Sequence, residues 1–119
     1  MRAFAKNFSR DEIAAAAKLC RAFGVKSYVT LNTLVFDREM RDMLAYAAFL
    51  EEAGVDALII ADMGAAALIR EKIPTMPLHA STQFSGHNAD AARFLAAHGF
   101  TRMVAARELS REDLTALCK

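Results

Sequence analysis

The sequence predicts an α/β fold in which about four parallel strands alternate with helices. Amphipathic helical patterns alternate with short apolar runs along the whole chain. A glycine follows three of the helical patterns, just before an apolar run, at Gly24, Gly54 and Gly99. Glycine is favoured there because it has no Cβ to clash in the left-handed conformation that ends many helices. Single strands separated by helices are joined by right-handed crossovers, which predicts a parallel sheet.

The first two helix–strand units are read from caps and apolar runs. Ser9 and Glu12 have the spacing of a capping box, so a helix is predicted to start there. Residues 25–30 (VKSYVT) follow as the first strand. Asp37 is placed to cap the second helix, and residues 55–61 (VDALIIA) form the second strand. Apolar runs of this kind suit strands that are buried on both faces.

The later units repeat the same order. A shorter helix is predicted over about residues 65–72, and residues 78–82 (LHAST) read as a short strand. Asn88 or Asp90 begins another helix, and residues 101–106 (TRMVAA) form the last strand. One further helix begins at the capping pair Ser110 and Asp113.

An open doubly wound sheet and a (β/α)8 barrel both satisfy this pattern. The dinucleotide fingerprint GxGxxG and the P-loop are absent, which weakens the nucleotide-binding versions of the open sheet. Four strands cannot close a barrel, because this type needs eight strands and about 250 residues. We therefore expect residues 1–119 to be a single partial barrel domain that belongs to a longer protein or assembles with another chain.

Composition excludes several classes of function. The chain is 55% hydrophobic and 24% charged, which is typical of a globular domain and not of a disordered one. The net charge is +1 with no basic run, so binding of a polyanion by charge alone is not expected. Cys20 and Cys118 form no CxxC motif and are interpreted as reduced thiols. No signal peptide or membrane-length apolar run is present, which predicts a cytoplasmic protein without a membrane partner.

Polar residues follow each predicted strand, at the edge that carries the site in both folds. His79 and Ser81 are two residues apart, so their side chains are expected on one face as a base and a nucleophile. Asp62, which closes the neighbouring strand, is the candidate acid of this set. The alternative is that His79 and Ser81 line the interior and hydrogen-bond each other or water.

Four more residues complete the candidate site. Arg107 and Glu108 are predicted to close the last strand, with their side chains on opposite faces. Arg107 is a candidate clamp for a carboxylate or phosphate and Glu108 a candidate acid–base residue, unless they form salt bridges between elements. Asn32 and Gln83 are candidates for positioning the substrate, or else they satisfy loop backbone. No metal site is predicted, because the histidines lack the spacing of ligands.

Five phrases in order resemble the peptidase U32 family, also called the collagenase-like proteases. They are AKNFS at residues 5–9, YVTLNT at 28–33, GVDALIIAD at 54–62, PLHASTQ at 77–83 and ARELS at 106–110. The resemblance covers nearly the whole chain and implies a TIM-barrel-like domain of which this segment is the second to fifth strands. The family's cysteine-rich signature, which holds an iron–sulfur cluster in some members, lies downstream and is not in this chain.

The resemblance implies two different functions. The first is a protease or other hydrolase of unassigned catalytic type, acting on a peptide or small-molecule substrate. For a peptidase, the residues themselves, and not the resemblance, suggest His79 as general base and Arg107 as clamp. The alternative is a non-catalytic barrel scaffold of an iron–sulfur protein that hydroxylates RNA or ubiquinone. No cofactor is expected in this segment, an iron–sulfur cluster belongs only to the full-length protein, and RNA enters as a partner only by family analogy.

An isolated half-barrel would expose two strand edges and its apolar interior. We therefore expect the chain to form a homodimer or to associate with the missing half of the barrel.

Overall fold

The computed structural model describes residues 7–118 and confirms the predicted alternation of helices and strands. Ala5 and Lys6 of the AKNFS phrase lie outside the described residues. In chain order the elements are α1 (Arg10–Ala22), β1 (Tyr28–Leu31), η1 (Asp37–Glu39), α2 (Met40–Glu52), β2 (Ala57–Ile60), α3 (Met63–Lys72), β3 (Leu78–Ala80), η2 (Thr82–Phe84), α4 (Ala89–Ala97), β4 (Phe100–Met103) and α5 (Arg111–Leu117).

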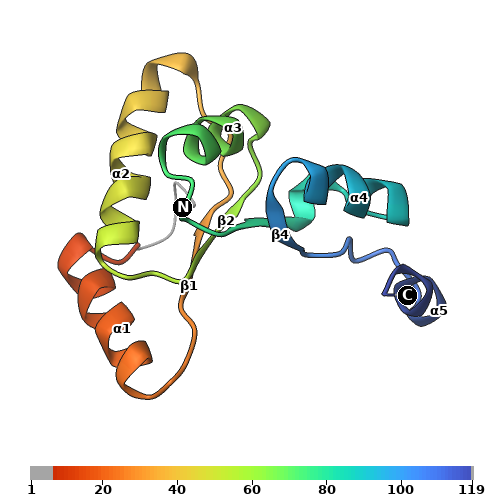
Figure 1. The fold of residues 1–119 in the computed structure, drawn as a ribbon, viewed down its shortest axis with the longest axis horizontal. Coiled ribbons are helices and arrows are strands. Elements are labelled where there is room, and N and C mark those ends of the chain that lie inside the picture. The colour runs from red at the N-terminus through yellow and green to blue at the C-terminus, as the bar shows by residue number, and fades with distance from the viewer. Residues whose placement is uncertain (1–6, 119) are drawn as a thin grey trace.

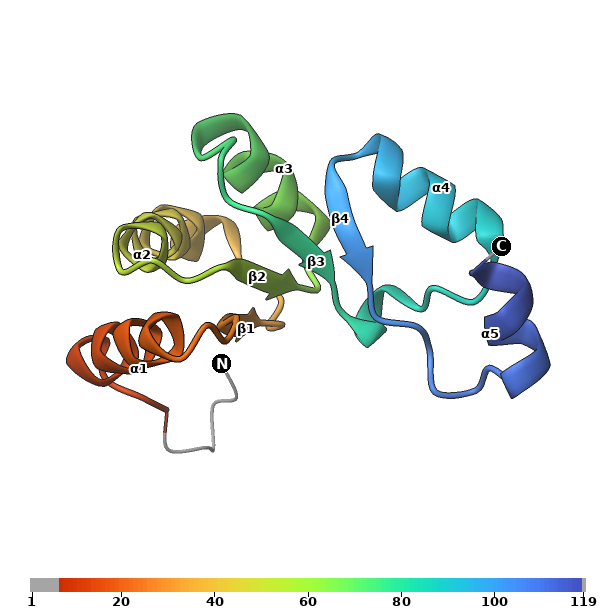
Figure 2. The ribbon, with the colours of Figure 1, turned by 60° about the horizontal axis from the view of Figure 1, so that its bottom comes forward.

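The sheet is parallel, and its strands lie side by side in the order β1-β2-β3-β4. An open doubly wound sheet reverses its strand order at a switch point, whereas a barrel adds each new strand on the same side. Figures 1 and 2 show the strands on the inside of an arc formed by α1, α2, α3 and α4. The fold is therefore α/β with four parallel strands, compatible with part of a TIM-like barrel.

The hydrophobic core lies between the sheet and the helices. Leu58 and Ile60 of β2 and Leu78 of β3 are almost completely buried there, against Leu50 of α2 and Ile69 of α3. Because strand side chains alternate, the residues between them point the other way, away from the helices. We call this opposite side of the sheet its inner face, since it would line the interior of a closed barrel.

The last strand is shorter than the sequence predicts. Strand β4 ends at Met103, and its pairing with β3 closes with the bond from the Val104 amide to the Ala80 carbonyl, at 2.9 Å. No further β3 residue is available to pair with, because β3 itself ends at Ala80. The prediction that Arg107 and Glu108 close the strand is therefore wrong: both lie beyond it, in a turn.

Serine caps begin the first and last helices as predicted. The Glu12 amide donates to Ser9 Oγ at 3.2 Å, and the Ser9 amide donates back to Glu12 Oε2 at 2.7 Å. Ser110 and Asp113 make the equivalent reciprocal pair at the start of α5. These contacts satisfy amide groups that have no partner within the helix.

Two other predicted helix starts are resolved by the structure. Asp37 does not cap α2, because the chain first turns through η1 and the helix begins only at Met40. Asn88, and not Asp90, caps α4: its Oδ1 accepts from the Ala91 amide at 2.9 Å.

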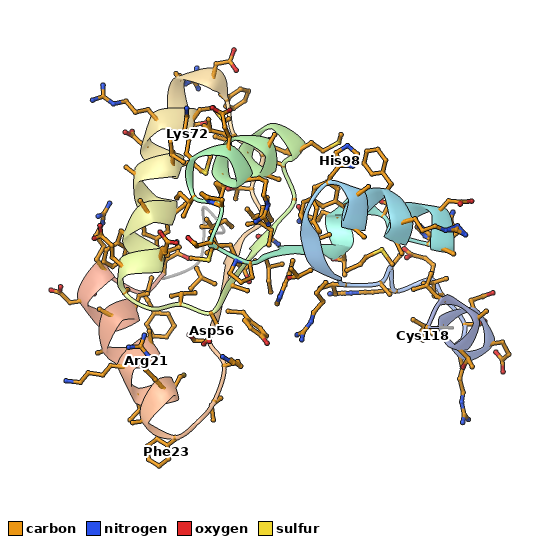
Figure 3. The ribbon with its side chains drawn as sticks, viewed as in Figure 1. Arg21, Phe23, Asp56, Lys72, His98 and Cys118 are labelled. Carbon is orange, nitrogen blue, oxygen red and sulfur yellow. The ribbon has the colours of Figure 1, made fainter. Side chains whose placement is uncertain are left out.

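Arginine side chains donate hydrogen bonds to two of the three glycine turns that precede strands. Gly24, Gly54 and Gly99 have φ of 66°, 81° and 81°, the left-handed conformation that the sequence predicts. The Arg21 guanidinium donates to the Gly54 carbonyl at 3.2 Å, and that of Arg70 donates to the Gly99 carbonyl at 2.6 Å. An arginine of an earlier helix thus holds the turn after a later helix; Figure 3 labels Arg21 near the end of α1.

The pairing of β3 with β4 contains a bulge. Leu78 pairs with Phe100, but the next residue, His79, pairs with Arg102, so that Thr101 is passed over. The Thr101 hydroxyl donates to the Leu78 carbonyl at 3.3 Å. A bulge of this kind changes the direction of the side chains that follow it.

Within the described part of the chain, no helix is both long enough and apolar enough to cross a lipid bilayer.

Candidate functional site

Asp62 stands where the sequence places it, at the end of β2, but both of its carboxylate oxygens accept from backbone. Oδ1 accepts from the Ala65 amide at 2.8 Å and caps α3, while Oδ2 accepts from the Val35 amide at 3.1 Å. The carboxylate therefore fastens the loop after β1 to the start of α3. Among residues 7–118 no hydrogen bond joins Asp62 to His79, and its role as a catalytic acid stays a prediction.

His79 and Ser81 are both buried, at 6% and 4% exposure. Ser81 Oγ accepts from the Gln83 amide at 3.3 Å and so caps the short helix η2. Within residues 7–118 no hydrogen bond joins the His79 ring to Ser81. The side chains thus lack the contact that a nucleophile and its base make, and their catalytic roles stay predictions.

His79 instead belongs to a group of three side chains on the inner face, which we call the inner-face cluster. The Tyr28 ring meets the His79 ring edge-on, with centroids 4.7 Å apart, and the Arg102 guanidinium lies 5.3 Å from the Tyr28 centroid. Burial, and then the positive charge of Arg102, hold the pKa of His79 below its usual value. The imidazole is therefore neutral at neutral pH.

The sequence analysis did not single out Tyr28 or Arg102. The alternation of side chains along β1 could have placed Tyr28 on one face of the sheet, because Tyr28 is two residues from Thr30 and points opposite to Val29. Arg102 gave no comparable signal, because its side of the sheet depends on the bulge beside Thr101.

A shallow cleft after β3 and β4, which we call the edge cleft, brings three of the predicted residues together. It encloses about 180 Å³ and is lined by Thr82, Gln83, Ser85, His87, Ala106, Arg107 and Glu108. His87 Nε2 lies 3.7 Å from Glu108 Oε2, and His87 Nδ1 is 2.6 Å from the Ser85 carbonyl oxygen. The cleft offers an arginine, an amide and a histidine–carboxylate pair, which suits the binding of a polar group.

Asn32 lies apart from the edge cleft. It follows β1 directly, is half-buried, and makes no side-chain hydrogen bond to another residue of the described range. The predicted residues therefore occupy separate places along the carboxyl ends of the strands and do not form one constellation.

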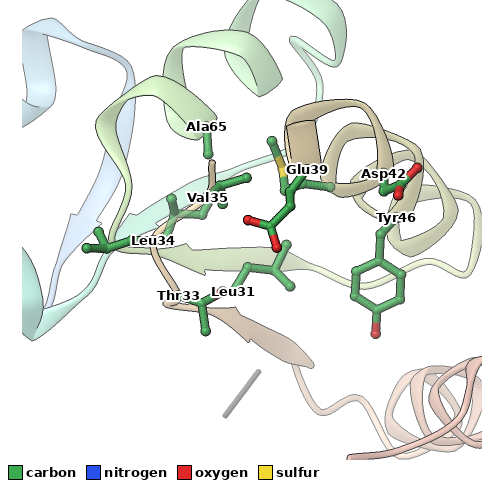
Figure 4. A pocket seen from close by; sticks show the side chains of 10 residues that line it. Leu31, Thr33, Leu34, Val35, Glu39, Asp42, Tyr46 and Ala65 are labelled. Atoms are coloured by element: carbon green, nitrogen blue, oxygen red, sulfur yellow. The ribbon is translucent and has the colours of Figure 1, made fainter. Parts of the chain in front are cut away.

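A second cavity, of about 300 Å³, lies between the ends of β1 and β2 and helix α2. Figure 4 shows the Glu39 carboxylate pointing into it above Leu31, with Asp42 and Tyr46 at its α2 side. Glu39 Oε2 accepts from the Phe36 amide at 3.0 Å. Burial raises the pKa of Tyr46, against a smaller opposing effect of the Arg10 charge. None of these side chains was predicted as a site residue.

The residues of this chain do not fit an iron–sulfur cluster. Such clusters are usually held by four cysteine thiolates. Cys20 lies half-buried in α1, whereas Cys118 is exposed at the end of α5, where Figure 3 labels it. Nowhere in residues 7–118 do three or more His, Cys, Asp or Glu side chains gather so as to hold a metal ion.

Comparison with known proteins places these features in a family. The model of peptidase family U32 matches residues 1–119. The chain is 39% identical over 109 residues to the 23S rRNA 5-hydroxycytidine C2501 synthase of Escherichia coli (strain K12), covering 92% of this chain and 16% of that protein. It is 34% identical over 110 residues to tRNA hydroxylation protein P2 of Bacillus subtilis (strain 168), covering 92% of this chain and 36% of that protein.

A relative with a different kind of name is nearly as similar. The chain is 33% identical over 110 residues to a collagenase of Porphyromonas gingivalis (strain ATCC BAA-308 / W83), covering 92% of this chain and 26% of that protein. The chain thus spans between 16% and 36% of the length of these three relatives. The match along the full chain, together with the parallel strand order, shows that this chain belongs to peptidase family U32.

Proposed function

We propose that this chain is the barrel segment of a protein that hydroxylates RNA. The observation that carries the proposal is the similarity to the rRNA 5-hydroxycytidine synthase, 39% identical over 109 residues, whereas one collagenase is 33% identical over 110 residues and another is 38% identical over only 80 residues. Two tRNA hydroxylation proteins, from Bacillus subtilis (strain 168) and Escherichia coli (strain K12), add support at 34% and 32% identity. On this proposal we expect a cytoplasmic location, because tRNA and ribosomes occur there.

The geometry of the predicted hydrolase residues agrees with this choice. Ser81 Oγ is engaged by the Gln83 amide, and both oxygens of Asp62 are engaged by backbone amides. A serine hydrolase needs a serine in contact with its base and a base oriented by an acid. Ser81 and Asp62 both cap short helical segments, which supports a scaffold role for them in this proposal.

In this proposal the chain binds and positions the substrate, while the redox chemistry belongs to an iron–sulfur cluster held by cysteines outside this segment. Arg107 and His87 of the edge cleft would contact the phosphate backbone of the RNA, since arginine matches phosphate with paired N–H donors. Gln83, beside them, would hydrogen-bond a base or a ribose hydroxyl.

The test uses the complete protein that contains this chain. It is expressed in Escherichia coli strains that lack either their own rRNA 5-hydroxycytidine synthase or their own tRNA hydroxylation protein. Mass spectrometry of the nucleosides from 23S rRNA and tRNA measures the product. Return of a hydroxylated nucleoside in either RNA is the expected result, and its absence from both RNAs, with the protein well expressed, would contradict the proposal.

A peptidase is the second candidate, because two collagenases of Porphyromonas gingivalis are also relatives, at 33% and 38% identity. Its test is hydrolysis of gelatin and short peptides by the same complete protein and by its His79→Ala variant. Hydrolysis that is lost in a folded His79→Ala variant would support the peptidase with His79 as its base. Unchanged hydrolysis in that variant would exclude His79 as the base.

A further inference from the structure

The inner-face cluster is assembled from three strands. Tyr28 comes from β1, His79 from β3 and Arg102 from β4, yet the Tyr28 and His79 ring centroids are only 4.7 Å apart. The Tyr28 side chain reaches across β2 to His79. The pairing partner of Tyr28 on β2 is Ala57, and its methyl group is too short to separate the Tyr28 and His79 rings. Arg102 pairs directly with His79 across the bulge. The sheet thus gathers these side chains at one place on its inner face.

The cluster carries a positive charge that no carboxylate of the described residues balances. The ion pairs among residues 7–118 join Lys26 to Asp56, Lys72 to Glu71, His87 to Glu108 and Arg93 to Asp90, and none includes Arg102. The apolar residue Ile59 pairs with His79 on its other side, whereas Arg102 itself is exposed. An exposed cation that has no carboxylate partner is open to an anion from solution.

The arginine is also oriented in advance. The Arg102 guanidinium lies over the Tyr28 ring, and this stacking leaves the N–H groups at its edge free to donate in pairs. Within residues 7–118 the His79 ring makes no hydrogen bond, so its nitrogens are available to a ligand. A neutral imidazole next to an arginine adds a hydrogen bond without adding repulsion between cations.

We propose that Tyr28, His79 and Arg102 form a binding site, inside the barrel, for the carboxylate or phosphate group of a small molecule. Arg102 would bind the oxyanion with two parallel hydrogen bonds, Tyr28 would hold the guanidinium in place, and His79 would hydrogen-bond a neighbouring polar atom. Side chains fill most of the interior of a closed barrel of this type, so at most a small molecule could be accommodated there and a polymer backbone could not. The site does not depend on whether the protein hydroxylates RNA.

Calorimetric titration of the complete protein with malonate and with inorganic phosphate tests the site. The wild-type protein is expected to bind at least one of these probes, and Arg102→Gln to weaken that binding about tenfold or more. Tyr28→Leu removes the stacking surface and should also weaken binding, whereas Tyr28→Phe keeps the ring and should not. Arg93→Gln is the matched control, because Arg93 is an exposed arginine on α4 that pairs with Asp90 outside the sheet.

Three results would overturn the proposal. One is wild-type protein that binds neither probe at millimolar concentration. A second is Arg102→Gln protein that keeps wild-type affinity while its circular dichroism is unchanged. The third is a short RNA oligonucleotide whose binding depends on Arg102 when that of malonate and phosphate does not, since the cation would then serve a polymer. If Arg102→Gln fails to fold, the contrast between Tyr28→Leu and Tyr28→Phe decides the question.

Discussion

At the strand ends of this domain, single polar side chains accept hydrogen bonds from backbone amides. Asp62 caps α3 through one oxygen and holds the loop after β1 through the other. Ser81 caps η2, although its position two residues after His79 suggested a nucleophile. Short polar side chains at the end of a strand compete for nearby amide groups, so the same residue type signals a cap as readily as a catalyst.

Replacement of Asp62 by alanine tests this structural role. Asp62→Ala removes a helix cap and leaves the Val35 amide without its acceptor, so we expect the free energy of unfolding to fall by about 2 kcal/mol. Asp37→Ala is the control, because Asp37 is exposed and caps no helix; its change should stay within about 0.5 kcal/mol. Urea unfolding followed by circular dichroism measures both, and equal losses would contradict the assignment.

The buried His79 should make stability depend on pH. Its pKa in the folded protein is lowered by burial and then by Arg102, so the unfolded state takes up a proton first as the pH falls. The free energy of unfolding should therefore decrease as the pH drops below about 6.5, the usual histidine pKa. Thermal melts between pH 7 and pH 5 measure this change. His79→Gln should remove this part of the pH dependence, and a curve that is unchanged in His79→Gln would contradict the prediction.

At the scale of elements, the turns at the amino ends of the strands differ in what surrounds their glycines. A methyl group added at Gly24 would meet no atom within 4 Å. The same methyl at Gly99 would lie 2.8 Å from the Nε atom of Arg70. This Nε atom is buried and makes no hydrogen bond within the described residues. At Gly54 it would overlap the Arg21 guanidinium, but Arg21 is exposed and can move away.

Alanine at these positions should separate backbone strain from loss of the arginine contact. Gly24→Ala should cost about 1–2 kcal/mol of unfolding free energy, from the left-handed backbone alone. Gly99→Ala should cost about 1–3 kcal/mol more, because Arg70 must move and release the Gly99 carbonyl. Urea unfolding measures the difference, and a double-mutant cycle with Arg70→Ala assigns it. Equal costs at the two glycines would mean that the Arg70 contact adds nothing.

The elements could be predicted from the sequence wherever the signal was local. The Ser9 and Ser110 caps and the glycine turns depend on neighbours within a few residues, and all were confirmed. The end of β4 could not be predicted, because it depends on where β3 stops pairing. The prediction that Asp37 caps α2 was wrong, because the short helix η1 begins at Asp37 and precedes α2, and the sequence of η1 cannot be told from that of the first turn of α2.

The site was predicted less completely than the fold, for the same reason. Gln83, Arg107 and Glu108 do meet in the edge cleft, although Arg107 and Glu108 lie beyond the end of β4 and the roles of all three stay predictions. Tyr28 and Arg102 meet only through the pairing of four strands, and no local pattern contains that information.

At the scale of the whole molecule, the outer edge of β4 has no strand partner among residues 7–118. On the inner face, Tyr28 is 40% exposed, although His79 beside it is buried at 6% exposure. Unpaired strand edges are templates for association with another chain. We therefore expect the isolated 119-residue chain to self-associate, as light scattering would measure. A monomer that persists at high concentration would contradict this expectation.

The bulge between β3 and β4 has a consequence for how this segment tolerates change in length. Along a strand, odd-numbered and even-numbered side chains point to opposite faces of the sheet. Because the pairing passes over Thr101, each residue after it points to the face opposite to the one it would occupy without the bulge. If Thr101 were not passed over and paired with His79, Arg102 would stand opposite Ala80 and turn toward the helices, away from His79. Loss of Thr101 itself would keep Phe100 opposite Leu78 and Arg102 opposite His79, in an unbroken ladder. A relative that is one residue shorter at Thr101 can therefore preserve the same inner surface, whereas one that loses Arg102 loses the cation of the inner-face cluster.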